Sequence, residues 1–467
     1  MIIVSIDIGS TWTKGAAFLL CPGDDLRLLR RSSHPTTVQD LSIGFESVLG
    51  RLVPPGEDYK LCYSSSAKGG LAVAAVGLVP ELTAEMAKVT ACSSGARLTQ
   101  SFAYELSAED ITSLKNAAPD IILLSGGSDG GNVFYPARNA QRIAEAEIAC
   151  SVVYAGNRSA GEHVASILRA RDVVCTENLL PTLDTPNPEP ARAAIREIFL
   201  SKITSGKGLD RIIDRTGCEP CPTPYALYEF CHSLAKHAPE FGEFVLVDMG
   251  GATTDVYSYH EELPVAGIVR RGLPEPAVKR TVEGDLGMRV SAASAFEAAG
   301  QLFQLSEQDS EVLSSYVRRL TSSPEHLAAS PQERHFDAVL AGANIATSLM
   351  RHAGRAHEVA TADGIVTVQT GRDLTSVKTI IGTGGYLSYS ADFDPRIHLP
   401  GIGIDKFGKR ILVSRHESYL RDTANLLPLL ANVSRKHPAA AAAAAVHLLS
   451  GVDLAITTQL PAKAACA

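Results

Sequence analysis

Residues 6–14 read IDIGSTWTK, an apolar strand that runs into a turn of glycine and hydroxyl side chains and ends in a lysine. Glycine lets a backbone approach an anion closely, and successive N–H groups in such a turn form an anion-binding nest. The candidates for phosphate binding in this turn are Gly9, Ser10, Thr11, Thr13 and Lys14. The alternative is an ordinary β-hairpin, in which an aspartate or threonine side chain satisfies the backbone of its own turn.

The second half of the chain repeats this pattern. Residues 247–255 read VDMGGATTD, and in both stretches a strand is followed by Asp, one apolar residue, Gly, a small residue and then a Thr six positions after the Asp. Two equivalent turns about half a chain apart are suited to grip phosphates from opposite sides of a cleft between duplicated domains. The candidates in the second turn are Gly250, Gly251, Thr253 and Thr254.

A third strand runs into glycines at residues 380–388, which read IIGTGGYLS. Such a junction suits the adenine and ribose of a nucleotide, because any side chain at the glycine positions would collide with them. The candidates here are Gly382, Thr383, Gly384 and Gly385.

Three acids accompany the first two turns, namely Asp7, Asp248 and Asp255. Crowded carboxylates repel one another unless a cation shares the site. We therefore expect the three aspartates to hold Mg²⁺, through its bound waters, and to orient an attacking water.

Strand and helix patterns alternate along the chain, which favours an α/β fold with helices on the faces of sheets. The clearest helices are predicted over residues 80–91 and 107–117, the second capped by Ser107, and further helices near 136–149 and 160–171. A Pro-rich, irregular stretch at about 181–224 indicates a junction or insertion. We expect two domains, residues 1–238 and 239–467, and the sequence does not define the structure after about residue 400.

Composition narrows the possible partners. The formal net charge is −8 and the basic residues are dispersed, so we expect no nucleic-acid partner. No apolar run approaches the roughly 20 residues that cross a bilayer, and Met1 is followed at once by a strand rather than by a signal sequence, so we expect a cytoplasmic protein with no membrane partner. The CEPC motif at Cys218–Cys221 lacks the second ligand pair that a zinc site needs.

Two further stretches contain polar groups near glycines. In LLSGGSDGGNV, Asp129 follows an apolar strand, and we expect this turn to line the cleft; a strand-to-helix turn that only needs glycine dihedral angles is the alternative. In SSSAKGG, Lys68 has the charge to reach a γ-phosphate, although a surface lysine beside a flexible turn is the commoner case.

The three glycine junctions resemble the first phosphate, second phosphate and adenosine motifs of the actin, Hsp70 and sugar-kinase ATPase superfamily. This resemblance implies an actin-like ATPase fold, in which two duplicated ribonuclease-H-like domains surround a nucleotide cleft. It also implies ATP and Mg²⁺ as cofactors, with Asp7, Asp248 and Asp255 matching the metal-binding and water-orienting acids.

More narrowly, the chain is similar to the MutL/GlmL family of accessory proteins associated with adenosylcobalamin-dependent glutamate mutase, a family unrelated to the mismatch-repair protein of the same name. The resemblance weakens after about residue 400. It is carried by SIDIGSTWTKGA (5–16), PDIILLSGGSDGGN (119–132), VDMGGATTDVYS (247–258), EGDLGMRVSA (283–292) and IIGTGGYL (380–387).

This resemblance implies an ATPase that acts as a reactivating chaperone and releases damaged cobalamin from a partner mutase. The chain has no DxHxxG stretch that would offer a histidine to cobalt, which fits a helper protein better than a cobalamin enzyme. Two alternatives stay open on the same scaffold. One is a small-metabolite kinase, and the other is an ATP-regulated, actin-like assembly or binding module.

Overall fold

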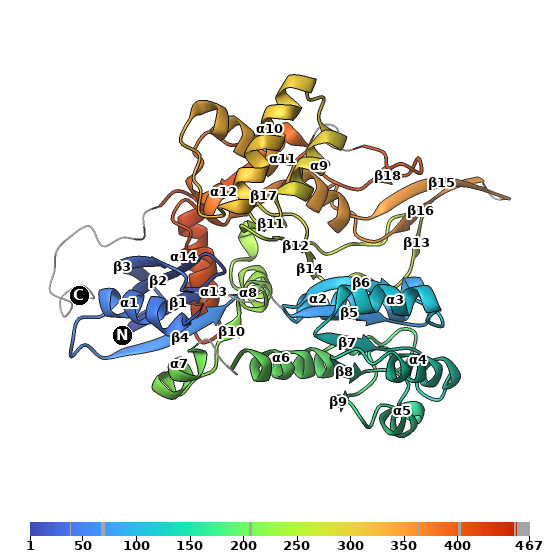
Figure 1. The fold of residues 1–467 in the computed structure, drawn as a ribbon. Coiled ribbons are helices and arrows are strands. Elements are labelled where there is room, and N and C mark those ends of the chain that lie inside the picture. Colours follow the sequence, from blue (N-terminus) through green and yellow to red (C-terminus); the bar gives the residue numbers. More distant parts are fainter. Residues whose placement is uncertain are drawn as a thin grey trace.

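The computed structural model describes residues 1–37, 39–66, 71–204, 208–362, 364–399, 403–452 and 454 of the 467-residue chain. The described residues form four sheets, with helices packed between and around them (Figure 1). Within these ranges, no helix is both long and apolar enough to span a bilayer.

The first sheet is built around the strand that contains Asp7. Alternate residues of this strand point to opposite faces, so Val4 and Ile6 enter one apolar cluster while Ile3 enters another. The first two strands form an antiparallel hairpin in which Asp7 is in register with Lys14. The sheet order is β3 (Leu26–Pro35), β2 (Trp12–Leu20), β1 (Ile2–Ile8), β4 (Tyr59–Ser65) and β10 (Cys221–Pro222), with α1 (Leu41–Leu52) against one face.

The second sheet repeats this topology. Its central strand forms an antiparallel hairpin with the next strand, placing Asp248 in register with Asp255, and pairs in parallel on its other side. When the strands of each sheet are numbered along the chain, both sheets have the spatial order 3-2-1-4-5. In each sheet the second strand runs antiparallel to its two neighbours, and the other pairs of neighbouring strands are parallel. The order here is β14 (Val278–Glu283), β12 (Thr254–Tyr259), β11 (Phe244–Met249), β17 (Thr379–Thr383) and β19 (Ser418–Arg421). The predicted duplication of ribonuclease-H-like domains in an actin-like fold is confirmed.

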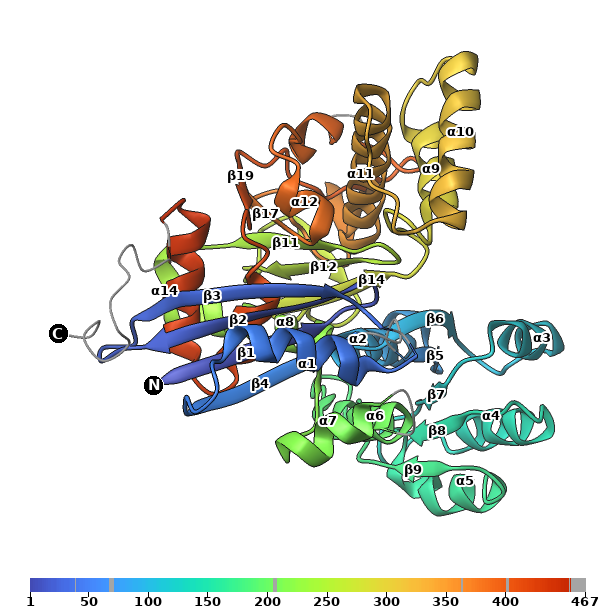
Figure 2. The ribbon, with the colours of Figure 1, turned by 60° about the vertical axis from the view of Figure 1, so that its left-hand side comes forward.

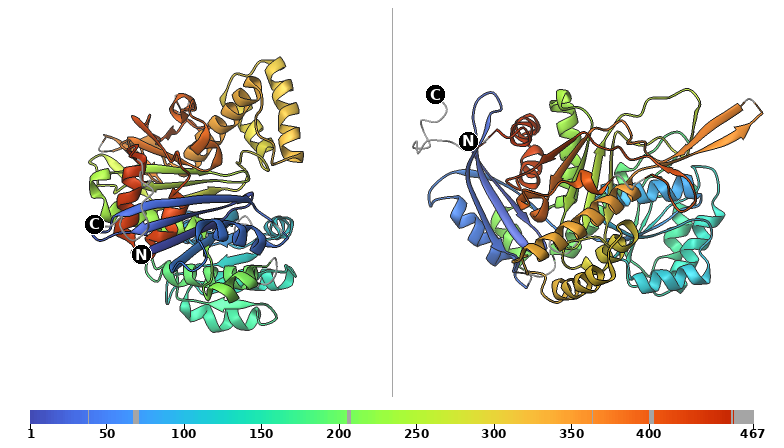
Figure 3. Two further views of the ribbon diagram at one scale, coloured as in Figure 1. Left: turned by 90° about the vertical axis from the view of Figure 1, so that its left-hand side faces the viewer. Right: turned by 90° about the horizontal axis from the view of Figure 1, so that it is seen from above.

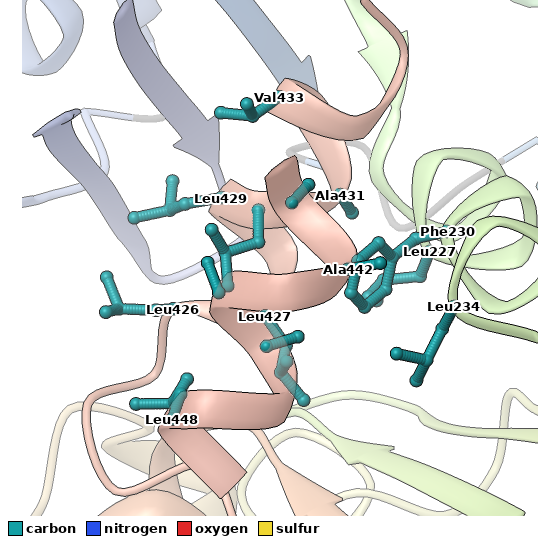
Figure 4. Packing of buried hydrophobic residues seen from close by; sticks show 14 of the residues in the cluster. Leu227, Phe230, Leu234, Leu426, Leu427, Leu429, Ala431, Val433, Ala442 and Leu448 are labelled. Atoms are coloured by element: carbon teal, nitrogen blue, oxygen red, sulfur yellow. The ribbon is translucent and has the colours of Figure 1, made fainter. Parts of the chain in front are cut away.

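Three helices fill the space between the two sheets: α8 (Thr223–His237), α13 (Leu427–Ser434) and α14 (Pro438–Leu449) (Figures 2 and 4). Their apolar side chains share one core with residues of both sheets, such as Phe18 and Leu246. The alanine run at the start of α14 is mostly buried, and small side chains allow helices to pack closely. The tail that the sequence left undefined therefore returns to the first sheet, where Ser5 Oγ donates to the Leu429 carbonyl at 2.8 Å.

A third sheet, wholly parallel, is inserted between β4 and β10 and was not predicted as a separate unit. Its order is β6 (Arg97–Phe102), β5 (Ala72–Val76), β7 (Ile121–Leu124), β8 (Ser151–Tyr154) and β9 (Val173–Cys175). Its helical elements are η1 (Pro80–Ala84), α2 (Glu85–Ser93), α3 (Ala108–Ala117), α4 (Phe134–Glu145), η2 (Arg158–Ala160) and α5 (Gly161–Ile167). Ser107 caps α3 as predicted, while α4 and α5 end earlier than the sequence indicated.

The second domain carries its own additions. A fourth sheet has the order β13 (Ile268–Arg271), β16 (Gly364–Thr370), β15 (Arg355–Thr361) and β18 (Arg410–Ile411), and its β15–β16 hairpin projects from the molecule (Figure 3). The helical elements here are α9 (Ala292–Leu302), α10 (Glu307–Ser322), α11 (Pro331–His352), α12 (Gly385–Tyr389) and η4 (Pro395–His398). The Pro-rich stretch contains α6 (Glu189–Thr204) and α7 (Leu209–Thr216), and η3 (Pro239–Phe241) precedes β11. The domain boundary near residue 239 stays a prediction.

Candidate functional site

The two glycine turns face one another across a cleft of about 1470 Å³. A Cβ atom added at Gly251 would lie 3.7 Å from Thr11 Cγ2, so the turns are close neighbours although 240 residues separate them in the chain (251 − 11 = 240). Twelve of the predicted site residues line this cleft: Asp7, Gly9, Ser10, Thr11, Lys14, Asp248, Gly250, Gly251, Thr253, Asp255, Gly384 and Gly385.

The first glycine of each turn closes the hairpin by the same hydrogen bond. Gly9 N–H donates to the Trp12 carbonyl at 3.0 Å, and Gly250 N–H donates to the Thr253 carbonyl at 2.9 Å. A Cβ at Gly9 would lie 2.7 Å from that Trp12 oxygen, a distance that a side chain cannot adopt without moving the turn. The duplicated sequence pattern therefore corresponds to a duplicated backbone geometry.

Asp7 is held at the end of β1 by two hydroxyl donors. Ser64 Oγ and Thr223 Oγ1 donate to Asp7 Oδ1 at 2.9 and 2.6 Å. These bonds fix the carboxyl group and leave Oδ2 for other contacts. Lys14 lies opposite in the hairpin register and also lines the cleft, so it places a positive charge near this acid.

Asp248 occupies the equivalent position on β11 and is partly buried. Burial, and then the charge of Asp255, raise the pKa of Asp248 to about 7, with Lys14 opposing the shift. A carboxylate whose charged form is disfavoured in this way is stabilised when a cation enters the site. Asp248 is therefore well placed to interact with a metal ion or its bound waters.

Asp255 is engaged by a buried arginine that the sequence did not indicate. Arg280 of β14 donates Nε and Nη2 to Asp255 Oδ1 at 2.9 and 2.5 Å, and it also donates to the carbonyls of Cys92 and Ala96 at the end of α2. Burial raises the pKa of Asp255, and the guanidinium opposes that shift. In the described part of the chain, no group of three acidic, histidine or cysteine side chains is arranged to hold a metal ion. All three aspartates line the cleft, and Asp255 is the one whose charge is already paired with a guanidinium. Their predicted role in holding a metal ion through its waters stays a prediction.

Four predicted site residues point elsewhere. Thr13 Oγ1 pairs with Thr36 Oγ1 at 3.1 Å, Thr254 Oγ1 donates to the Leu286 carbonyl at 2.9 Å, and Thr383 Oγ1 donates to Asp422 Oδ2 at 2.8 Å. A Cβ at Gly382 would meet the Tyr419 hydroxyl at 2.6 Å. None of the four lines the cleft, and we leave them out of the proposed site.

The third glycine junction lies directly against the second turn. Gly384 has φ +95°, and a Cβ there would lie 2.3 Å from the Met249 carbonyl oxygen and 3.0 Å from Asp248 Oδ1. Gly385, the first residue of α12, has open space where a side chain would lie. Gly384 is therefore required by packing and backbone conformation, and its contact with adenosine stays a prediction.

The far wall of the cleft contains polar and aromatic groups that the glycine motifs did not reveal. Arg289 donates to both carboxylate oxygens of Asp337 at 3.2 and 3.0 Å, and Tyr316 OH donates to Asp337 Oδ1 at 3.0 Å. The rings of Phe393 and His398 stack with centroids 5.5 Å apart. Arg289 lies within EGDLGMRVSA, so the family resemblance was the available signal for it; nothing in the sequence pattern singled out Asp337.

The secondary candidates lie outside the cleft. Asp129 follows β7 of the inserted sheet, where its Oδ1 accepts from Arg158 N–H at 3.0 Å and from Asn178 Nδ2 at 2.9 Å, so the expectation that it lines the cleft is wrong. Lys68 lies outside the described residues. Cys218 and Cys221 are free thiols, the first exposed and the second buried.

A nucleotide with Mg²⁺ fits the groups in this cleft. The glycine turns offer backbone that phosphates can approach, Lys14 offers charge, and Asp248 is a partly buried acid with a raised pKa that a cation would stabilise. The residues that would hold the phosphates are those of the two turns, and Asp7 and Asp248 would hold waters of the metal.

Comparison with known proteins gives one family. The sequence profile described as "MutL protein" matches residues 3–448. Protein MutL of Clostridium tetanomorphum is 35% identical over 453 residues, which cover 93% of this chain and 96% of that protein.

Similar solved structures are more distant. Nucleotide-free acetone carboxylase has a TM-score of 0.39 at 12% identity, covering 92% of this chain and 70% of that one. A glycerol dehydratase reactivase has a TM-score of 0.34 at 9% identity, covering 93% of this chain and 100% of that one. Ligand-bound xylulose kinase from Lactobacillus acidophilus has a TM-score of 0.32 at 10% identity, covering 95% of this chain and 90% of that one. The fold assignment rests on the strand order described above, not on these scores.

Proposed function

The chain belongs to the MutL family, and from that premise we propose that it is an ATP-dependent accessory protein that reactivates an adenosylcobalamin-dependent mutase, with glutamate (methylaspartate) mutase as its partner. The single observation that carries the ATP-dependent part is the pair of matched glycine turns that face each other across one cleft. The mutase partner follows from the family resemblance.

Each part of the site has a distinct task in ATP hydrolysis. The backbone of the two turns and the Lys14 ammonium would stabilise charge on the transferred phosphoryl group, which is the main demand of this chemistry. Bound Mg²⁺ would neutralise part of the negative charge on the phosphate oxygens. Asp7, fixed by Ser64 and Thr223, would orient a water of the metal, and Asp248 would orient the attacking water.

Movement of the domains would connect the nucleotide to the partner. The two turns belong to different sheets, so a nucleotide gripped by both draws the sheets together. The helices between the sheets share one apolar core with both domains. A change in cleft closure therefore alters how outer surfaces, including the projecting β15–β16 hairpin, are presented to the mutase. Release of an inactive corrinoid would follow from that change.

The arrangement of acids bears on the kinase alternative. A kinase needs a base that is free to accept a proton from the acceptor hydroxyl. Asp255 is held by Arg280, and Asp337 by Arg289. These ion pairs make Asp255 and Asp337 unsuited to act as that base, so a kinase would need Asp248, the acid that the proposal assigns to the attacking water.

ATP turnover by the purified protein tests the proposal. With Mg²⁺, we expect slow hydrolysis that rises when glutamate mutase loaded with cyanocobalamin is added, and loss of this rise in Asp248→Asn. Asp129→Asn is the matched control, because that aspartate also lies near a glycine pair at the end of a strand but outside the cleft. Turnover that responds to a small hydroxyl compound and not to the mutase would instead identify a kinase.

A further inference from the structure

Asn425 lines the cleft and lies on the chain connection between the second sheet and α13. It follows β19 of the second sheet and precedes α13, which packs on the first sheet. It lines the cleft together with Asp7, Thr223 and Asp248. The position belongs to neither glycine turn, and no part of the proposed function uses it.

The side chain of Asn425 is buried with its hydrogen-bonding capacity unused. Only 3% of the residue is exposed, and neither Oδ1 nor Nδ2 has a hydrogen-bond partner among the described residues. Its backbone has φ 52°, in the left-handed region that non-glycine residues seldom adopt. Buried amide groups without partners and left-handed residues both cost free energy, and such features concentrate at functional sites.

The surrounding turn holds Asn425 in this state. Asp422 accepts the N–H groups of Leu426 and Leu427 at 2.9 Å each, while Asn425 N–H donates to the Asp422 carbonyl at 3.0 Å. Asp422 also accepts from Thr383, the last residue of β17. The backbone of the turn is thus fixed on both sides of Asn425.

The same contacts place Asn425 near the phosphate end of the cleft. Thr383 is in register with Asp248 on the neighbouring strand β11, and the Asp422 turn follows β19, which pairs with β17 on its other side. The hydrogen bond from Thr383 to Asp422 therefore brings the turn that carries Asn425 to the end of the strand beside Asp248. Arg289, Asp337 and the Phe393–His398 stack come from other elements of the second domain.

We infer that Asn425 is a further binding residue of the cleft, whose amide contacts the phosphates of the nucleotide or the waters of its metal. An amide suits this position because Nδ2 donates to a phosphate oxygen while Oδ1 accepts from a metal-bound water. Because the residue lies between β19 of the second sheet and α13, its contact would link the bound phosphates to the segment that joins the two sheets. This inference rests on the nucleotide-binding part of the proposed function and is independent of the mutase.

Asn425→Gly gives a test with two readouts. Glycine accepts φ 52° without strain and removes the two unpaired polar atoms. Without nucleotide, we therefore expect the variant to unfold at the same temperature as the wild type or at a higher one. With nucleotide, we expect the Kd for MgATP and for MgADP, measured by calorimetry, to rise at least about tenfold, the effect of losing a hydrogen bond to a charged group. The Kd for adenosine should not change.

Asn139→Ala is the matched control. Asn139 lies on α4, is 2% exposed, donates Nδ2 to the Tyr104 carbonyl at 2.9 Å and accepts from Leu106 N–H at 2.9 Å, and it does not line the cleft. This variant should unfold at a lower temperature and bind MgATP with unchanged affinity. Asn425→Ala serves as a second variant at the proposed position, with the same expected loss of affinity.

Three outcomes would overturn the inference. Wild-type affinity for MgATP in both Asn425 variants would refute it and leave the proposed function intact. An equal loss of adenosine affinity would show a deformed cleft and refute the assignment to the phosphates. Absence of MgATP binding by the wild type would overturn the inference and the proposed function together.

Discussion

Replacement of Arg280 by methionine tests how the buried acids of the cleft are balanced. Arg280 and Asp255 are 2% and 6% exposed, and two hydrogen bonds join them. Methionine keeps much of the volume but leaves the carboxylate without its counter-charge. Loss of one partner of a buried ion pair costs about 3–5 kcal/mol, and here the carbonyls of Cys92 and Ala96 lose a donor as well.

The loss should depend on pH in a defined direction. Burial already raises the pKa of Asp255 in the presence of Arg280, and without the guanidinium that pKa rises further. A carboxyl group with a raised pKa in the folded state destabilises the fold when it is charged, above that pKa, and ceases to do so once it is protonated. The stability deficit of Arg280→Met should therefore be largest at pH 8 and shrink as the pH falls.

Urea unfolding at pH 5, 7 and 8 measures this effect. The wild type, Arg280→Met, Asp255→Asn and the double variant form a cycle, for which we expect a coupling free energy of about 2–3 kcal/mol at pH 7. Arg271→Met is the control, because its ion pair with Glu81 is largely exposed and should contribute little. A deficit below about 1 kcal/mol, or one that is equal at pH 5 and pH 8, would refute the reasoning.

The remaining predictions concern the phosphate end of the cleft. Because burial raises the pKa of Asp248 to about 7 and the charged form is needed beside a cation, MgATP affinity measured by calorimetry should fall with decreasing pH, approaching about tenfold for each pH unit below 7. Asp248→Asn should bind weakly with a flat pH profile, and a wild-type affinity that is constant from pH 5.5 to 8 would contradict this role. Gly384→Ala should destabilise the protein by about 2–4 kcal/mol in urea, because φ +95° and a contact at 2.3 Å both exclude a side chain. Gly385→Ala has open space and should be neutral, and equal effects of the two substitutions would show that the Gly384 contact does not matter.

Much of the fold follows from patterns that are local in the sequence. Each of the two hairpins combines an apolar strand with a glycine turn, and repetition of the pattern at residues 7 and 248 indicated a duplicated domain. The helix capped by Ser107 followed from its cap. The inserted parallel sheet was missed as a unit, because strand patterns do not reveal which strands pair when long segments separate them.

The error over the threonines has a simple physical cause. Neighbouring residues on a strand point to opposite faces, so Thr13 cannot face the cleft together with Lys14, nor Thr254 together with Asp255. The structure shows that alternation. Lys14 and Asp255 line the cleft, whereas the hydroxyl of Thr13 pairs with Thr36 and that of Thr254 donates to the Leu286 carbonyl. Strand alternation could have excluded these residues from the sequence alone.

The partners of the acids could not be predicted in the same way. Arg280 reaches Asp255 across adjacent strands and also binds the end of α2, more than 180 residues earlier in the chain. Asn425 enters the cleft only because α13 returns to the first sheet. Both contacts depend on the assembled domains, and neither residue belongs to a motif.

Release of inactive cobalamin from the mutase tests the proposed function most directly. Glutamate mutase would be loaded with cyanocobalamin, and free corrinoid would be separated by filtration and measured by its absorbance, with MgATP, MgADP or no nucleotide. We predict release that requires this protein and MgATP and that is absent with Asp248→Asn, followed by recovery of mutase activity when adenosylcobalamin is added. Corrinoid that stays bound to the mutase under all of these conditions, although the protein binds MgATP, would contradict the proposal.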